Sequence, residues 1–232
     1  MRVVFVHGAC VRDGAWWWRR AAGHLEDGGV TSTAPPLPSC GETGRPPGQG
    51  GPSLPDDVAE VRAHLAASDE PAIVVAHSYG GVVAGEAAAG LPQVRHLLYV
   101  ASFLPEAGES LASFGGDTPA PYLDVTQDGT FGVRREVAAR TFMQDCAEED
   151  VVEGLARLVR QTVSATAEPV GAAAWREIPS TYLVCARDNG TPPALQRAQA
   201  ERAGRALEID AGHHPFLSRS RQVAELVLGL PV

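Results

Sequence analysis

Short apolar runs alternate along this chain with longer stretches in which apolar residues recur at helical spacing. The apolar runs predict strands over residues 3–7, 30–34, 72–77, 96–101, 181–186 and 206–210. Helical spacing, as in Trp17, Ala21 and Leu25, predicts helices over residues 16–27, 55–67, 79–89, 192–203 and 220–228. Alternating strands and helices are typical of an α/β fold, in which helices cover both faces of a mostly parallel sheet.

The alternation stops between residues 101 and 178. This stretch is rich in Gly and Pro and has two amphipathic segments, which predict helices over 133–141 and 148–163. Its length exceeds that of an ordinary connection. We therefore predict a core formed by residues 1–103 and 176–232, with residues 104–175 inserted as a helical lid. Residues 39–55 are predicted to form a loop, again because of their Gly and Pro content.

The sharpest local signal is Ala76-His-Ser-Tyr-Gly80, which joins the strand at 72–77 to a helix of small residues. A nucleophile placed on such a tight strand-to-helix turn needs small neighbours, because strand and helix nearly touch. The helix N-terminus also favours a developing negative charge. Ser78 is therefore the candidate nucleophile, although a serine in an ordinary turn is the simpler alternative. His77 beside it is expected to pack rather than to act as the base.

A serine hydroxyl needs a neighbouring base, and the stretch after the last predicted strand offers two. His213 and His214 follow the strand at 206–210, and we favour His213. Asp188 directly follows the strand at 181–186 and would orient the histidine, although an Asp-Asn-Gly turn alone also explains it. The order Ser, Asp, His is that of α/β-hydrolases. Glu106 is the alternative acid.

An acyl-transfer site also needs two backbone N–H groups for the oxyanion. The first should come from Tyr79, which follows the nucleophile. The second should come from Ala9 or Cys10 in the loop after the first strand, where Gly8 lets the backbone approach a substrate closely.

Composition narrows the chemistry further. All 19 basic residues are Arg, and without Lys there can be no Schiff-base lysine, pyridoxal-phosphate site or Walker A loop. The net charge is −9, and no basic patch is visible that would bind nucleic acid. The four cysteines are scattered, and no cluster has metal-ligand spacing. We expect no cofactor, no metal and no membrane span, and the strand-like N-terminus predicts a cytoplasmic protein.

Five stretches of the sequence resemble the α/β-hydrolase superfamily. They are most similar to its compact branch of plant methylesterases, hydroxynitrile lyases and small bacterial esterase-like proteins. The matching stretches are residues 6–10 with 14–18, 76–81, 101–105, 188 with 192–193, and 212–215. The resemblance implies Ser78, Asp188 and His213 as a catalytic triad. It further implies Ala9 and Tyr79 as oxyanion donors, and a lid over the site.

Three departures from the family pattern matter. Ala76 replaces the first glycine of the turn. Because residues 3–7 are predicted as the first parallel strand, we expect the antiparallel strands that precede it in relatives to be shortened or missing. Gly8 stands where the hydroxynitrile lyases have a threonine, and their site lysine has no counterpart, which argues against that lyase chemistry. A serine nucleophile argues against dehalogenase and epoxide hydrolase chemistry, since those enzymes need an Asp.

These observations predict a serine hydrolase that acts on an ester, thioester or lactone of a small apolar or aromatic substrate. The candidate pocket residues are Cys10, Trp16, Phe103, Tyr122, Phe142, Trp175 and His214. Two alternatives stay open: the same triad used for C–C cleavage, lyase or cyclisation chemistry, and a non-catalytic ligand-binding protein. A homodimer is possible.

Overall fold

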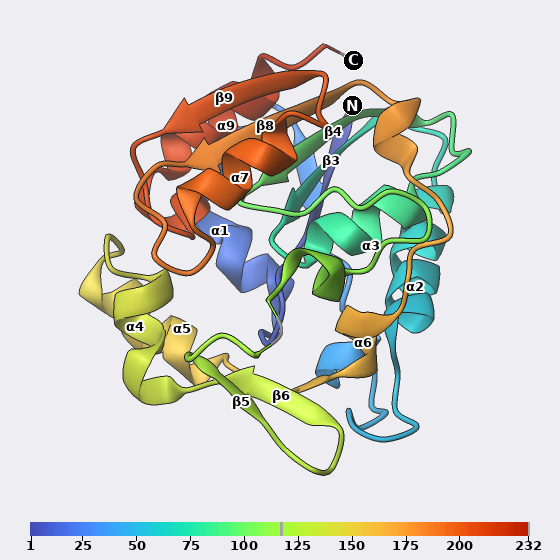
Figure 1. Cartoon of the computed structure of the whole chain (residues 1–232). Helices are drawn as coiled ribbons and strands as arrows, with labels where there is room; N and C mark the ends of the chain where they lie inside the picture. The colour runs from blue at the N-terminus through green and yellow to red at the C-terminus, as the bar shows by residue number, and fades with distance from the viewer. Residues whose placement is uncertain (117, 232) are drawn as a thin grey trace.

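The computed structural model describes residues 1–116 and 118–231. Six parallel strands form its main sheet, in the order β2-β1-β3-β4-β8-β9 (Figure 1). Their bounds are β1 Arg2–Val6, β2 Thr31–Thr33, β3 Ala72–His77, β4 Val94–Val100, β8 Ser180–Cys185 and β9 Arg205–Ile209. Every residue of β3 is buried, because helices cover both faces of the sheet. The predicted α/β-hydrolase fold, with its mostly parallel sheet, is confirmed.

Two hydrophobic cores lie on opposite faces of this sheet. Successive side chains of β1 alternate between them: Val4 packs in one core and Phe5 in the other. Helices α2, α3 and α7 cover the first face, and α3 and α7 lie toward the viewer in Figure 1. Helices α1, α8 and α9 cover the second. The bounds are α1 Gly14–Asp27, α2 Leu54–Ala66, α3 Gly80–Ala87, α7 Pro193–Ala200, α8 Pro215–Ser218 and α9 Ser220–Leu228.

The inserted segment runs between β4 and β8, which pair with each other although some 80 residues separate them. It holds a small antiparallel sheet, order β5-β6-β7, with short helices around it (Figure 1). Its strands and α-helices are β5 Leu123–Val125, β6 Thr130–Val133, β7 Gln161–Thr162, α4 Arg135–Phe142, α5 Glu148–Ala156 and α6 Ser164–Ala167. Three 3-10 turns complete the described elements: Pro38–Cys40, Leu111–Phe114 and Ala174–Arg176.

The sequence pattern missed the small sheet, and it made the second helix of the segment too long. The predicted helix over 148–163 ends at Ala156. Beyond it the chain pairs with the loop after β1: Leu158 forms a β-bridge with Val11, and Val159 N–H donates to the Cys10 carbonyl. These contacts with distant residues override the local helical spacing. Within the described residues, no helix combines the length and the apolar character needed to cross a membrane.

Candidate active site

Ser78 lies on the tight turn between β3 and α3, in the left-handed region with φ 51°. A residue other than glycine is held there only when its surroundings enforce it. Those surroundings are crowded: a Cβ on Gly80 would overlap the carbonyl oxygens of Val6 and His7, and one on Gly81 would overlap Ser102 Oγ. The two glycines therefore let α3 start directly against β1 and the end of β4.

Asp188 and His213 meet at the carboxyl ends of β8 and β9, as predicted. His213 Nδ1 lies 2.6 Å from Asp188 Oδ2. Since a carboxylate only accepts, Nδ1 carries the proton, and in the neutral ring Nε2 is left as an acceptor. Ser78 and His213 line the same cavity. The alternative acid, Glu106, pairs instead with Arg176 at the surface.

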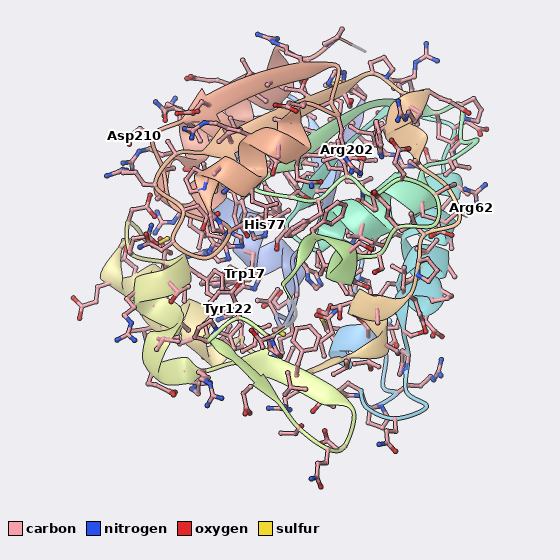
Figure 2. All side chains as sticks on the ribbon, viewed as in Figure 1. Trp17, Arg62, His77, Tyr122, Arg202 and Asp210 are labelled. Carbon is pink, nitrogen blue, oxygen red and sulfur yellow. The ribbon has the colours of Figure 1, made fainter. Side chains whose placement is uncertain are left out.

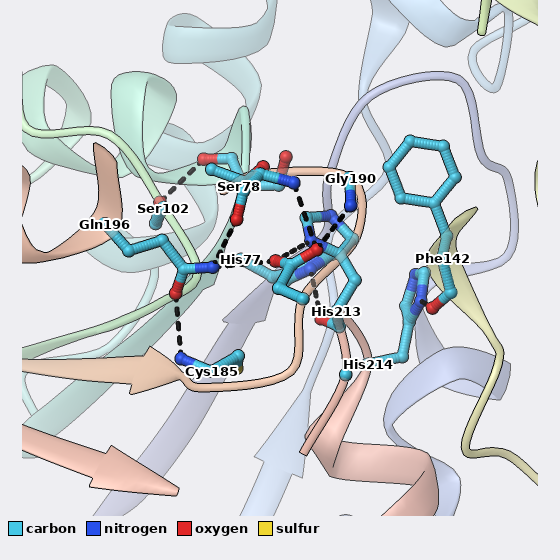
Figure 3. A network of polar contacts seen from close by, with 12 residues as sticks. His77, Ser78, Ser102, Phe142, Cys185, Gly190, Gln196, His213 and His214 are labelled. Carbon is cyan, nitrogen blue, oxygen red and sulfur yellow. Dashed lines mark hydrogen bonds and ion pairs between the residues drawn. The ribbon is translucent and has the colours of Figure 1, made fainter. Parts of the chain in front are cut away.

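A residue that the sequence analysis did not single out holds the acid. Gln196 is fully buried in α7 and donates from Nε2 to Asp188 Oδ2 at 2.8 Å, while its Oε1 accepts the Cys185 N–H (Figure 3). The backbone N–H groups of Gly190 and Thr191 donate to Asp188 Oδ1. Together with His213, four donors surround the carboxylate and stabilise its negative charge. The only sequence signal for Gln196 was its place on the buried face of a predicted helix.

His77 and His214 pack around His213, and each of them hydrogen-bonds a backbone carbonyl. His77 Nε2 donates to the His213 carbonyl at 3.0 Å (Figure 3). His214 Nδ1 donates to the Phe142 carbonyl at 2.7 Å, and its ring stacks on Trp17. Burial, reinforced by the neighbouring His213, lowers the pKa of His214 to about 3 and that of His77 well below its usual range. Both rings are therefore neutral at physiological pH, and neither contacts Asp188 as His213 does.

The two candidate oxyanion donors, Ala9 and Tyr79, belong to residues that line the same cavity. Within the residues that the structure describes, the backbone N–H groups of Ala9 and Tyr79 have no hydrogen-bond acceptor. Of the two candidates in the loop, the Cys10 N–H is bonded to Gln161 Oε1 at 3.0 Å, which leaves the Ala9 N–H as the candidate donor. A Cβ on Gly8 would lie 2.9 Å from His77 Nδ1 and 3.1 Å from Ser78 Cβ, so the threonine of hydroxynitrile lyases has no room here.

Behind the oxyanion loop lies a buried pair, His7 and Glu42. His7 Nε2 contacts Glu42 Oε2 at 2.7 Å, and Nδ1 contacts the Gly8 carbonyl at 2.8 Å. Burial lowers the pKa of His7, but the hydrogen bond and charge of Glu42 outweigh it, so that the pKa is raised. Burial raises the pKa of Glu42, and His7 in turn outweighs it, so that this pKa is lowered. Glu42 also accepts the N–H groups of Asp13 and Leu37, which fixes the loop after β1.

A cavity of about 730 Å³ opens above Ser78, between the core sheet and the inserted segment. Figure 2 shows His77, Trp17 and Tyr122, which line it, following one another from the sheet toward the β5–β6 hairpin. Its wall is predominantly apolar, and none of its described lining residues is Asp, Glu, Arg or Lys. The volume lies within the roughly 300–1,000 Å³ typical of small-molecule pockets.

Five of the seven predicted pocket residues line this cavity: Cys10, Phe103, Tyr122, Phe142 and His214. The other two were wrong. Trp16 is half-buried against the second core, with the guanidinium groups of Arg19 and Arg157 over its ring, and its neighbour Trp17 reaches the cavity instead. Trp175 is buried in the core beneath α3 and donates from Nε1 to the Pro105 carbonyl.

Comparisons with known proteins show to which family the chain belongs. A sequence model of the Alpha/beta hydrolase family matches residues 3–226. The chain belongs to the α/β-hydrolase family. It is 28% identical to methylesterase 7 of Arabidopsis thaliana, over 98% of this chain and 95% of the relative. It is 32% identical to a pimeloyl-[acyl-carrier protein] methyl ester esterase of Xanthomonas campestris, over 75% and 76%.

Among solved structures, this α/β-hydrolase is similar to a pyrethroid hydrolase from Sphingobium faniae JZ-2. The TM-score is 0.85 with 22% identity, covering 98% of this chain and 96% of the other. That likeness concerns the fold. The named relatives are esterases, so the expected resemblance to the methylesterase branch and the expected carboxylic ester hydrolase type of enzyme are confirmed. The predictions about partners, oligomeric state, cofactors and cellular compartment stay predictions.

Proposed function

We propose that this α/β-hydrolase cleaves neutral esters of apolar or aromatic acids through an acyl-enzyme on Ser78. The observation that carries the proposal is the 2.6 Å contact between His213 Nδ1 and Asp188 Oδ2, which leaves Nε2 as a proton acceptor in the cavity that Ser78 also lines. Such a base turns a weakly nucleophilic hydroxyl into an attacking group.

The proposed reaction has two halves. In the first half, Ser78 Oγ attacks the carbonyl carbon of the ester while His213 takes the proton of the Ser78 hydroxyl. The carbonyl oxygen becomes an oxyanion, which accepts hydrogen bonds from the Ala9 and Tyr79 N–H groups. His213 then gives the proton to the leaving alcohol. In the second half, His213 deprotonates a water molecule, which attacks the acyl-serine and releases the acid. Asp188 stabilises the positive charge of His213 in both halves.

The cavity supports the choice of substrate. A charged substrate would have to leave water without an opposite charge to pair with, because the described lining residues carry none apart from the histidines. Aromatic side chains of Phe103, Phe114, Tyr122 and Phe142 instead offer surface for an apolar acyl or alcohol group. We therefore expect esters or lactones with apolar or aromatic groups to be substrates, and esters that carry a free carboxylate to be poor ones.

A panel of p-nitrophenyl esters tests the proposal. The wild-type protein should hydrolyse the acetate, butyrate and benzoate esters, and should turn over a matched ester with a free carboxylate in its acyl chain at least roughly 10-fold more slowly. Ser78→Ala should abolish turnover while circular dichroism shows the same fold. Unchanged hydrolysis by Ser78→Ala would refute the proposal. Inertness of wild type toward every ester, with Ser78 still reactive toward a fluorophosphonate, would favour the lyase or cyclase alternative.

A further inference from the structure

The loop that carries the candidate oxyanion donor Ala9 is held by the inserted segment. The backbone of the next residue, Cys10, is in the left-handed region with φ 59°, a conformation that needs external support. Two groups from the segment supply that support. Gln161 Oε1 accepts the Cys10 N–H at 3.0 Å, and Val159 N–H donates to the Cys10 carbonyl at 2.9 Å.

Gln161 itself is fixed by a buried hydrogen-bond network that ends at the other oxyanion donor. Its Nε2 donates to Ser39 Oγ at 2.9 Å, and Ser39 Oγ donates to Asp57 Oδ2 at 2.5 Å. The Tyr79 hydroxyl donates to the same Asp57 oxygen at 2.6 Å. We call Cys10, Gln161, Ser39, Asp57 and Tyr79 the buried polar network. It connects the neighbour of Ala9 with the side chain of Tyr79 itself.

The members of the network are fully buried. The Cys10 N–H can only donate, so Gln161 Oε1 must face it and Gln161 Nε2 is left to donate to Ser39 Oγ, while Asp57 also accepts the Ser39 N–H at 2.8 Å. The Gln161 amide therefore has one orientation, with its oxygen toward Cys10. Fully satisfied buried networks of this kind are rigid, because each bond broken leaves a polar group without water.

We propose that Gln161 and Asp57 are positioning residues that hold the Ala9 and Tyr79 N–H groups at the separation an oxyanion requires. The inference rests on the proposed function, since it concerns the same site. It makes the inserted segment part of the catalytic apparatus. The segment covers the cavity and also supports one of the two oxyanion donors, so that its displacement would remove part of the cavity wall and the support of the Ala9 N–H together.

The test is the rate at which an alkyl fluorophosphonate phosphonylates Ser78, because this probe needs no knowledge of the natural substrate. Its oxygen develops charge in the same place as a substrate carbonyl. Saturation kinetics separate the maximal rate of inactivation from the apparent binding constant. Gln161→Leu removes both of its hydrogen bonds to the network. Its maximal rate should fall roughly 10-fold or more, short of the 10²–10³-fold loss for deleting an oxyanion donor outright. The binding constant should stay within about twofold.

Thr162→Val is the matched control. The Thr162 hydroxyl accepts the Gly48 N–H at 3.1 Å, so this variant also removes a buried hydrogen bond between β7 and the core, one residue away. It does not touch the buried polar network, and its maximal rate should match that of wild type. Thermal unfolding of each variant shows that it is folded at the assay temperature.

Tyr79→Phe tests the network from its other end. It removes only the hydroxyl, keeps the backbone N–H, and should again lower the maximal rate at an unchanged binding constant. If Gln161→Leu does not fold, Tyr79→Phe decides. The inference is overturned if the folded variants keep the wild-type maximal rate, if Thr162→Val loses as much, or if only the binding constant changes. A wild-type protein that is not labelled on Ser78 would instead overturn the proposed function, and the inference with it.

Discussion

The acid–base side and the oxyanion side of the site are supported by different parts of the molecule. Asp188 and His213 themselves are hydrogen-bonded by core residues: Gln196 comes from α7 and His77 from β3. The Cys10 backbone is hydrogen-bonded by the inserted segment, through Gln161 and Val159, while Glu42 of the core holds the two ends of the loop. The segment reaches the acid–base side only through neighbours of the two residues, such as Gly212, whose N–H donates to Asp145, whereas on the oxyanion side it bonds both backbone groups of Cys10, directly beside Ala9. The predictions below probe the two sides separately.

The largest effect should come from the acid on the core side. Asp188→Asn places a donor opposite His213 Nδ1 and so favours the wrong tautomer of the base. We expect kcat to fall on the order of 10⁴-fold with an intact fold. Glu106→Gln, which alters the alternative acid, should leave kcat unchanged. Steady-state hydrolysis of one p-nitrophenyl ester measures both, and equal losses in the two variants would show that Asp188 has no special role.

The next effect concerns the stability of the acid–base side in acid. Unfolded His214 takes up a proton below about pH 6.5, but the folded protein resists this until its pKa of about 3. Stability should therefore fall as the pH drops through this window, by up to roughly 1.4 kcal/mol per pH unit from this one group. His77, whose pKa is also lowered, acts in the same direction. Urea unfolding at several pH values between 7 and 4 measures the free energy of unfolding. This free energy should fall less steeply with pH in His214→Gln than in the wild-type protein, and equal slopes would contradict the account.

The oxyanion side should respond to pH with the opposite sign. The pKa of His7 is raised in the folded protein, because Glu42 outweighs the effect of burial. The stabilisation from this pair is fully present below the unfolded pKa of His7 and is lost as the pH rises through its folded value. The stability difference between wild type and His7→Gln should therefore shrink from pH 6 to pH 9, as measured by urea unfolding. A difference that grows toward alkaline pH would show that the pair is not ionised as described.

The smallest effect on catalysis should come from replacing a tryptophan that belongs to neither the acid–base side nor the oxyanion side of the site. Trp16 is half-buried between two arginines and is not among the described lining residues of the cavity, so Trp16→Leu should change kcat/KM by less than about twofold. Phe103→Leu, within the cavity wall, should raise KM for the benzoate ester more than for the acetate ester. If Trp16→Leu alters KM as strongly as Phe103→Leu, the cavity extends further than its lining residues indicate.

The core could be predicted from sequence because its signals are local. The run over residues 72–77 and the small residues around Ser78 each reflect a steric requirement of their own neighbourhood. The order of Ser78, Asp188 and His213 was informative because it matches that of α/β-hydrolases. The structure places Asp188 and His213 in contact, as the sequence analysis expected.

The inserted segment could not be predicted in the same way. Gln161 and Thr162 continue the polar end of a helical pattern, and only their contacts with Cys10, Ser39 and β6 make them a strand. The two wrong pocket residues have a similar cause. Which of two adjacent tryptophans faces the cavity depends on where α1 packs, and the Trp16–Trp17–Trp18 run satisfies any helical phase.

The central claim is that His213 activates Ser78. Peptide mapping by mass spectrometry after treatment with a fluorophosphonate tests it most directly. The account predicts a single label on Ser78 in the wild-type protein, no label on that peptide in Ser78→Ala, and labelling slowed on the order of 10³-fold or more in His213→Gln. A label that forms on another residue, or that forms on Ser78 equally fast without His213, would contradict it.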